Sequence, residues 1–266
     1  MLKTTLPKLQ SEYVQAGALQ MYCETQGQGR PLLLLHGGTA TIQTSFEKAR
    51  PVLVKRCTTV AVEQQGHSHT ADIDRPLAYE QMVEDTAALL RQKKIANADV
   101  FGWSDGGIVA PGLAARHPDL VREVATIGSG YNTGAGKQEF NHRKATMKPD
   151  NEQTLPFRDA YRNVAPKPED WPLLIEKVKA VWVSFKGWPN AEMRSLKAPL
   201  MVMLGDTDFI LPEHTLELFR MVTRGRLAIL PGSDHSARSR KAIGCRHAGG
   251  LFRRGVARWP CGSERH

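Results

Sequence analysis

The chain has 266 residues, of which 41% are hydrophobic and 24% charged, a composition typical of a globular protein with a large core. Its formal net charge is +9, but residues 236–266 hold eight Lys or Arg and one Glu, so the rest of the chain is close to neutral and we expect no nucleic-acid partner for it. We find no run of about 18 apolar residues to span a membrane and no signal-peptide core after Met1, so we expect a cytoplasmic protein.

The first third of the chain predicts alternating strands and helices. Apolar runs predict strands at 19–23, 31–35, 58–62 and 98–101, and the segments between the later strands predict helices at 46–55 and 79–90. The run at 31–35 is apolar throughout, which is typical of a parallel strand buried on both faces. Ligands of such sheets bind in loops at the carboxyl ends of strands, here His36-Gly37-Gly38 and Glu63 to Thr70.

A glycine-rich turn, Phe101-Gly102-Trp103-Ser104-Asp105-Gly106-Gly107, joins the strand at 98–101 to a predicted helix at 107–117. Such a turn pushes the serine hydroxyl out of the edge of the sheet. Gly102 and Gly106 are needed because a Cβ would collide in so tight a turn. The helix directs its first N–H groups and its positive dipole end toward Ser104. Pro111 conflicts with this helix and costs roughly 3 kcal/mol unless the helix kinks there.

Beyond a predicted strand at 121–127, the pattern changes between Tyr131 and Asn190. This block has several short helical runs separated by prolines and no long apolar strand. It contains one apolar stripe at helical spacing, which we interpret as core packing rather than ligand contact: Trp171, Ile175, Val178, Trp182 and Phe185. We therefore predict a helical cap at 131–190, inserted between two parts of a core domain, 1–130 and 191–235.

The sheet pattern resumes after the cap, with strands predicted at 199–204 and 226–230 and a helix at 213–222. The alternation of strands and helices predicts an α/β fold with a doubly wound, mostly parallel sheet. The two strands lead to Gly205-Asp206-Thr207-Asp208 and to Pro231-Gly232-Ser233-Asp234-His235. A serine hydroxyl becomes a good nucleophile when an imidazole takes its proton and a carboxylate holds the resulting imidazolium. Ser104, His235 and one of the two aspartates at 206 and 208 can form such a set.

These motifs, in this order, resemble those of the α/β-hydrolase family over residues 19–235. The resemblance implies that Ser104 is the nucleophile, that His235 is the general base and then the acid, and that Asp208 orients His235. It favours Asp208 over Asp206 because the acid of the family usually sits at the last place of Gly-x-x-Asp. It also implies oxyanion donors at the backbone N–H groups of Gly38 and Asp105. We expect four residues to contact the substrate: His36, Gly37, Trp103 and Asp105.

The activity that the resemblance implies is that of a serine hydrolase cleaving small carboxylic esters through an acyl-enzyme, as carboxylesterases do. The fold alone does not determine this, because related scaffolds host lactonases, amidases, amino-acid esterases, carbon–carbon hydrolases and cofactor-free perhydrolases. A different class of function is a catalytically silent protein that binds a ligand, or nucleic acid through its basic tail. The complete set of Ser104, Asp208 and His235 argues against silence.

Asp105 has two interpretations. Gly-Trp-Ser-Asp-Gly-Gly is similar to the elbow of valacyclovir-hydrolase-like esterases, in which this aspartate is thought to hold the ammonium of an α-amino-acid ester. The other interpretation is a carboxylate at a helix start, stabilised by the helix dipole. We favour the second slightly over the first.

We expect no cofactor and no metal ion. His67-x-His69 lacks an evident third ligand, and the four cysteines have no spacing typical of a zinc site or a disulfide framework. The expected partner is a small-molecule ester substrate, with no membrane partner, and the oligomeric state is left open.

Residues 236–266 depart from the family pattern, in which a helix packed on the sheet follows the active-site histidine. They are rich in Arg, Gly and Ser, and we predict a basic, poorly ordered tail. One interpretation is a segment for nucleic acid or an anionic surface. The other, which we favour, is a shift of the coding frame just after His235.

Overall fold

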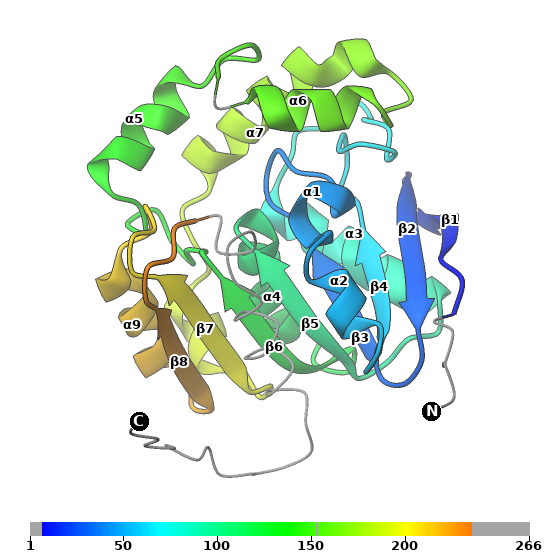
Figure 1. Ribbon diagram of the computed structural model, residues 1–266. Helices are drawn as coiled ribbons and strands as arrows, with labels where there is room; N and C mark the ends of the chain where they lie inside the picture. Colours follow the sequence, from blue (N-terminus) through cyan, green and yellow to red (C-terminus); the bar gives the residue numbers. More distant parts are fainter. Residues whose placement is uncertain (1–6, 153, 236–266) are drawn as a thin grey trace, which may run out of the picture.

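The computed structural model describes residues 7–152 and 154–235 of the chain (Figure 1). These residues form a mostly parallel sheet of eight strands, with helices packed against it. The strands are β1 (Gln10–Ala16), β2 (Leu19–Gly27), β3 (Pro31–Leu35), β4 (Thr58–Val62), β5 (Ala98–Trp103), β6 (Val121–Ile127), β7 (Leu200–Gly205) and β8 (Gly225–Leu230). Their order in the sheet is β1-β2-β4-β3-β5-β6-β7-β8. The pairs β1–β2 and β2–β4 are antiparallel, and β3 to β8 pair in parallel. The predicted doubly wound sheet is confirmed.

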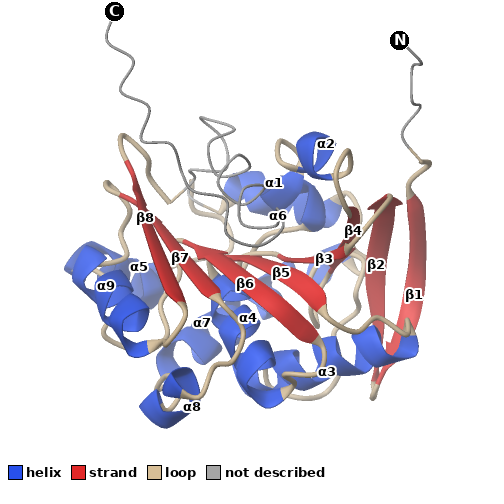
Figure 2. Cartoon of the chain, turned by 90° about the horizontal axis from the view of Figure 1, so that it is seen from below, coloured by secondary structure: helices blue, strands red, loops and turns tan. Residues whose placement is uncertain are grey.

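The described helices are α1 (Ile42–Phe46), α2 (Arg50–Leu53), α3 (Tyr79–Gln92), α4 (Asp105–Arg116), α5 (Gln138–Thr146), α6 (Leu155–Arg162), the 3₁₀ turn η1 (Pro168–Asp170), α7 (Trp171–Ser184), α8 (Asn190–Arg194) and α9 (Pro212–Met221). In Figure 2, α3, α4 and α9 lie on one side of the sheet, and α1 and α2 lie on the other. The apolar strand β3 explains this arrangement. Leu33 and Leu35 belong to the core beneath α3 and α4, whereas Leu32 and Leu34 pack toward α1 and α2.

One prediction about local structure was wrong, and one strand was missed. The single helix predicted at 46–55 is two short helices, α1 and α2, because Pro51 fits the first turn of a helix but not its interior. The strand β1 was not predicted. It lies at the edge of the sheet, and only Val14 and Ala16 of its seven residues are buried, so its sequence carries almost no apolar signal.

The helix α4 runs through Pro111 without ending there. Trp188 packs on this part of α4: its Nε1 donates to the carbonyl oxygen of Ile108 at 2.8 Å, and its ring lies directly against Gly112. The guanidinium of Arg116 lies over the same ring, 4.7 Å from its centroid. Packing from outside the helix therefore holds α4 together around the proline.

The helices α5, α6 and α7 lie above the strand ends, at the top of Figure 1. An isolated bridge pairs Asn132 with Gly187, so this helical block leaves the sheet and rejoins it at neighbouring points. We propose these helices as a cap over the core formed by residues 1–130 and 191–235. The tail predicted at 236–266 lies outside the described residues.

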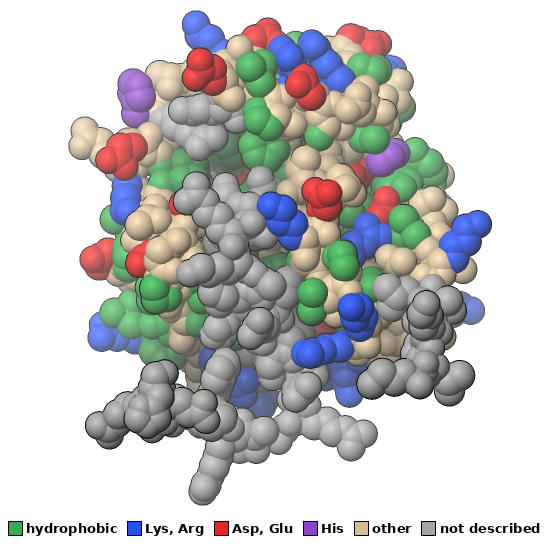
Figure 3. Space-filling view, in the orientation of Figure 1, with side chains coloured by type: hydrophobic (Ala, Val, Ile, Leu, Met, Phe, Trp, Pro, Cys, Tyr) green, Lys and Arg blue, Asp and Glu red, His purple; other side chains and the backbone are tan. Residues whose placement is uncertain are grey.

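Charged side chains of both signs are interspersed over the described part of the face in Figure 3, as expected for a body of nearly neutral charge. Among the described helices, none is long and apolar enough to cross a membrane.

Candidate active site

Ser104 occupies a strained turn between β5 and α4, with φ 54° and ψ −119°. Non-glycine residues rarely adopt a positive φ, and such strain concentrates at functional sites. The turn can form because a Cβ on Gly102 would lie 2.1 Å from the carbonyl oxygen of Gly106, and one on Gly106 would lie 2.1 Å from that of Leu35. Only glycine fits at both places, as the sequence predicted, so the two glycines hold Ser104 at the end of β5.

Ser104, His235 and Asp208 lie in one hydrogen-bonded series, although they come from the ends of three strands. The Oγ of Ser104 is 3.1 Å from Nε2 of His235, and Nδ1 of His235 is 3.0 Å from Oδ1 and 3.2 Å from Oδ2 of Asp208. Asp208 is only 1% exposed. With Nδ1–H donating to the carboxylate, the lone pair of Nε2 faces the serine hydroxyl, which is the tautomer that proton abstraction requires.

Asp206, the other candidate for the acid, has different partners. Its carboxylate accepts hydrogen bonds from the N–H groups of Gly232 and Ser233 at 3.0 and 3.1 Å, and these bonds lower its pKa. Asp206 thus braces the loop that carries His235, whereas the carboxylate beside the imidazole is that of Asp208.

Two aromatic rings hold His235. The ring of Phe209 stacks on the imidazole with centroids 3.9 Å apart, and Nε1 of Trp103 donates to the carbonyl oxygen of His235 at 3.0 Å. Trp103 was expected to contact substrate. The structure places its ring against Gly37 and His235, and Trp103 does not line the pocket of Ser104.

The backbone N–H groups of Gly38 and Asp105, predicted as oxyanion donors, have no acceptor among the described residues. The two residues are in close contact, since a Cβ on Gly38 would lie 2.3 Å from Oδ2 of Asp105. The Gly38 loop is held from behind, where Nε2 of His67 lies 2.6 Å from the carbonyl oxygen of Gly38. The N–H groups of Gly38 and Asp105 are therefore not used by the described backbone.

His36 and Gly37, expected to contact the substrate, do not line the pocket of Ser104 but border a smaller neighbouring pocket together with Asp105. Nδ1 of His36 donates to the carbonyl oxygen of Gly37 at 2.8 Å, and Nε2 accepts from the N–H of Gln64 at 3.0 Å. Burial lowers the pKa of His36 to about 3, so the ring is neutral and both nitrogens are used by the backbone. His36 therefore links the Gly37 loop to the backbone of Gln64.

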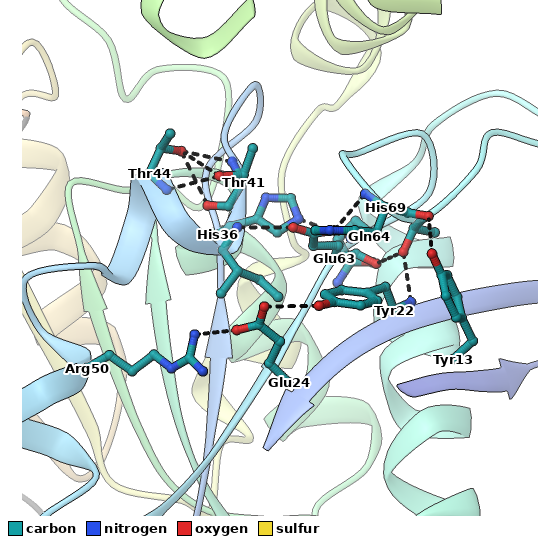
Figure 4. A network of polar contacts seen from close by, with 12 residues as sticks. Tyr13, Tyr22, Glu24, His36, Thr41, Thr44, Arg50, Glu63, Gln64 and His69 are labelled. Atoms are coloured by element: carbon teal, nitrogen blue, oxygen red, sulfur yellow. Dashed lines mark hydrogen bonds and ion pairs between the residues drawn. The ribbon is translucent and has the colours of Figure 1, made fainter. Parts of the chain in front are cut away.

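A polar network next to this loop was not foreseen from the sequence (Figure 4). The buried carboxylate of Glu63 accepts from the N–H of His69 at 2.8 Å and lies 2.9 Å from its Nδ1, and the ring of Tyr22 stacks on that of His69. Thr70 joins them, because its Oγ1 accepts from the N–H of Tyr22 and donates to the carbonyl oxygen of Glu63. The sequence feature that could have indicated this network is Glu63, a charged residue directly after the apolar strand β4.

The histidines at 67 and 69 are thus occupied by protein groups. In residues 7–152 and 154–235, no three His, Cys, Asp or Glu side chains are grouped so as to hold a metal ion.

The pocket that contains Ser104 has an empty volume of about 480 Å³, including space open to solvent. Its walls are mostly apolar and come from the core and from the cap helices: Tyr79, Ile108, Ala135, Phe140, Trp182, Phe185, Phe209 and Ile210. The apolar stripe at 171–185 that we predicted as core packing therefore lies partly in the core and partly in the pocket wall. Trp171, Ile175 and Val178 are buried in the core, whereas Trp182 and Phe185 border the pocket. Helical spacing alone cannot distinguish the two environments.

Asp105 is held by the cap. Nε1 of Trp182 donates to its two carboxylate oxygens at 2.9 and 3.1 Å, and the residue is 8% exposed. Burial raises the pKa of Asp105, and the bond from Trp182 partly opposes this. The carboxylate therefore links α4 to α7 at the edge of the pocket.

Comparison with known proteins shows the family of this chain. The Alpha/beta hydrolase family model matches residues 32–240. Serine hydrolase BPHL of Mus musculus is 24% identical over 246 residues, which cover 87% of this chain and 82% of that protein. The 2-hydroxymuconate semialdehyde hydrolase of Pseudomonas sp. (strain CF600) is 23% identical, with 86% and 88% of the two chains covered. Naproxen esterase of Bacillus subtilis superposes with a TM-score of 0.73 at 16% identity over 92% of each chain, a similarity of fold alone.

Proposed function

Because the chain belongs to the alpha/beta hydrolase family, we propose that it is a serine hydrolase that cleaves small carboxylic esters through an acyl-enzyme. The observation that carries this proposal is the hydrogen-bonded series from Ser104 through His235 to Asp208, with Ser104 lining a pocket. A buried carboxylate, a correctly oriented imidazole and a hydroxyl in a pocket are the parts that acyl transfer to serine needs.

The proposed reaction begins when Nε2 of His235 takes the proton of Ser104 and Oγ attacks the ester carbonyl carbon. The carbonyl oxygen becomes an oxyanion, which the N–H groups of Gly38 and Asp105 stabilise. Asp208 stabilises the imidazolium and does not itself take the proton. The carbon–oxygen bond to the alcohol then breaks, and His235 gives its proton to the departing oxygen.

The second half of the reaction repeats these steps with water. His235 takes a proton from water, the hydroxyl attacks the acyl carbon, and the bond to Oγ of Ser104 breaks as His235 returns the proton. The products are a carboxylic acid and the free enzyme.

Ester cleavage is the acyl transfer that asks least of the protein. An alkoxide leaves with one proton from His235, whereas cleavage of a carbon–carbon bond requires a substrate group that can accept the electron pair. The mostly apolar walls of the pocket suit a small acyl group. These two arguments favour small esters over the other chemistries found on this fold.

The test is labelling of Ser104 with a fluorophosphonate probe, followed by intact-mass analysis. We expect one adduct on the wild type and none on Ser104→Ala, together with hydrolysis of p-nitrophenyl butyrate by the wild type only. Equal labelling of both proteins, or no labelling of either, would contradict the assignment of the nucleophile.

A further inference from the structure

Lys144, on the cap helix α5, is a cation in the wall of the pocket that the proposed mechanism does not use. Its Nζ lies over the ring of Phe140, 4.5 Å from the centroid. Among the described residues, none forms an ion pair or hydrogen bond with the Lys144 side chain. The ammonium group of Lys144 is therefore part of a mostly apolar pocket wall.

Such a cation is costly to keep there. Burial lowers the pKa of Lys144, because the charged form loses hydration, and the field of Asp105 opposes this only in part. The face of an aromatic ring attracts a cation but does not replace a carboxylate. An anion that enters the pocket would recover the interaction that Lys144 lacks.

Asp105 does not serve as the partner of Lys144, because Nε1 of Trp182 on the neighbouring helix α7 donates to both of its carboxylate oxygens. The two charges also come from different parts of the fold. Asp105 begins α4, next to Ser104, whereas Lys144 lies on α5, in the helical layer above the strand ends (Figure 1). A substrate with its carbonyl at Ser104 can thus extend its far end toward Lys144.

We propose that Lys144 binds a carboxylate at the end of the substrate remote from the reacting carbonyl, so that the preferred substrates are half-esters of dicarboxylic acids. This inference rests on the proposed ester hydrolysis, since it names the substrate class of the same site. Lys144 is then a specificity-determining residue that acts on substrate binding.

The experiment compares monobenzyl glutarate and monobenzyl adipate with the uncharged esters of equal carbon number, benzyl valerate and benzyl hexanoate. We expect the wild type to prefer at least one half-ester over its uncharged counterpart. Lys144→Met should lower kcat/KM for that half-ester roughly ten- to hundredfold, mainly through KM, and leave the uncharged esters within about twofold. Lys144→Arg should restore part of the preference, because the charge returns.

Lys148→Met is the matched control, because Lys148 is an exposed lysine just beyond α5 that does not line the pocket. It should leave all four rates unchanged. If Lys144→Met lowers the charged and uncharged esters equally, or if the wild type prefers the uncharged ester at both lengths, the inference is wrong.

Direct binding separates this inference from the proposed function. Calorimetry with adipate on Ser104→Ala should give binding that Lys144→Met in the same background weakens at least about tenfold. If no ester is hydrolysed but adipate binding depends on Lys144, the anion site stands and the ester proposal fails. If esters are hydrolysed and adipate binding ignores Lys144, the anion site fails.

Discussion

At the scale of single residues, the partners of a carboxylate decide its role. Asp206 and Asp208 stand two places apart in one turn, yet Asp208 contacts the imidazole of His235 and Asp206 contacts two backbone N–H groups of the following loop. Both are plausible acids in sequence, and only one is placed to orient His235. Removing the charge of each should therefore have different consequences.

Asp208→Asn should lower kcat on the order of 10⁴-fold and leave KM nearly unchanged, because an amide at this place favours the wrong tautomer of His235. Asp206→Asn should lower kcat less than about tenfold, since Asn keeps an acceptor for Gly232 or Ser233. Steady-state kinetics on p-nitrophenyl butyrate measures both. The reverse ranking would transfer the role of the acid to Asp206.

The contacts of Asp105 favour one of the two interpretations of this residue. Because Trp182 holds its carboxylate and burial raises its pKa, we propose that Asp105 begins α4 and anchors the cap rather than binding an ammonium group. Asn keeps an acceptor for Trp182, so Asp105→Asn should change the ratio of kcat/KM for valine and isovalerate benzyl esters by less than about twofold. A fall of this ratio by roughly tenfold or more, the size expected from a lost charge pair, would favour the amino-acid-ester interpretation.

At the scale of elements, α4 is held by packing that its own sequence does not explain. Pro111 removes a donor from the helix interior and Gly112 lowers helix propensity, but the missing Cβ of Gly112 makes room for the ring of Trp188. A Cβ at this glycine would lie 2.5 Å from Cζ2 of Trp188. The contact joins the chain that leaves α7 to α4, the helix that Ser104 precedes.

Gly112→Ala should therefore lower the melting temperature, although alanine is the better helix former by about 1 kcal/mol, because overpacking costs about 1–3 kcal/mol. In a Trp188→Phe background, the same change should cost at least about 1 kcal/mol less, since the smaller ring relieves the clash. Urea denaturation of the four proteins measures this coupling. Additive effects would show that the contact is not the cause.

At the scale of the whole molecule, two buried histidines make stability depend on pH. His36 is buried, with Nε2 accepting from the N–H of Gln64, and Nε2 of His214, on α9, accepts from the N–H of Tyr131 at 3.0 Å. Burial lowers the pKa of His36 to about 3 and that of His214 to about 4, below the value of about 6.5 in the unfolded chain. Below pH 6.5 the unfolded chain therefore binds protons that the folded protein does not.

The free energy of unfolding should then fall as the pH falls from about 6.5 to 4, by about 1.4 kcal/mol per pH unit for each histidine. Above about pH 7 both histidines are neutral in both states, so neither makes the stability depend on pH. His214→Gln keeps an acceptor for the N–H of Tyr131 and removes one of the two groups that bind a proton in the unfolded chain. The stability difference between wild type and variant should thus shift in favour of the variant as the pH falls. Parallel curves over pH 7 to 4 would contradict the assignment.

The features that the sequence alone determined are local ones. The sequence predicted β3, β4 and β6 at their observed bounds. The signal is strongest for β3, because a strand buried on both faces favours a continuous apolar run. Gly102 and Gly106 marked the elbow because close backbone approach excludes any Cβ. The order of the loops after successive strands was enough to select Ser104 and His235 as candidates.

Contacts between distant parts of the chain were decided only by the tertiary structure. Trp182 reaches Asp105 from 77 positions away, and His235 reaches Ser104 from 131 positions away. The same holds for the bond between His36 and the backbone of Gln64, and for the place of Lys144 in the pocket wall. The reason is physical. A period of apolar residues shows which face of a helix is buried, but not whether that face meets the core or an open pocket, and the partner of a polar group depends on which loops the sheet brings together.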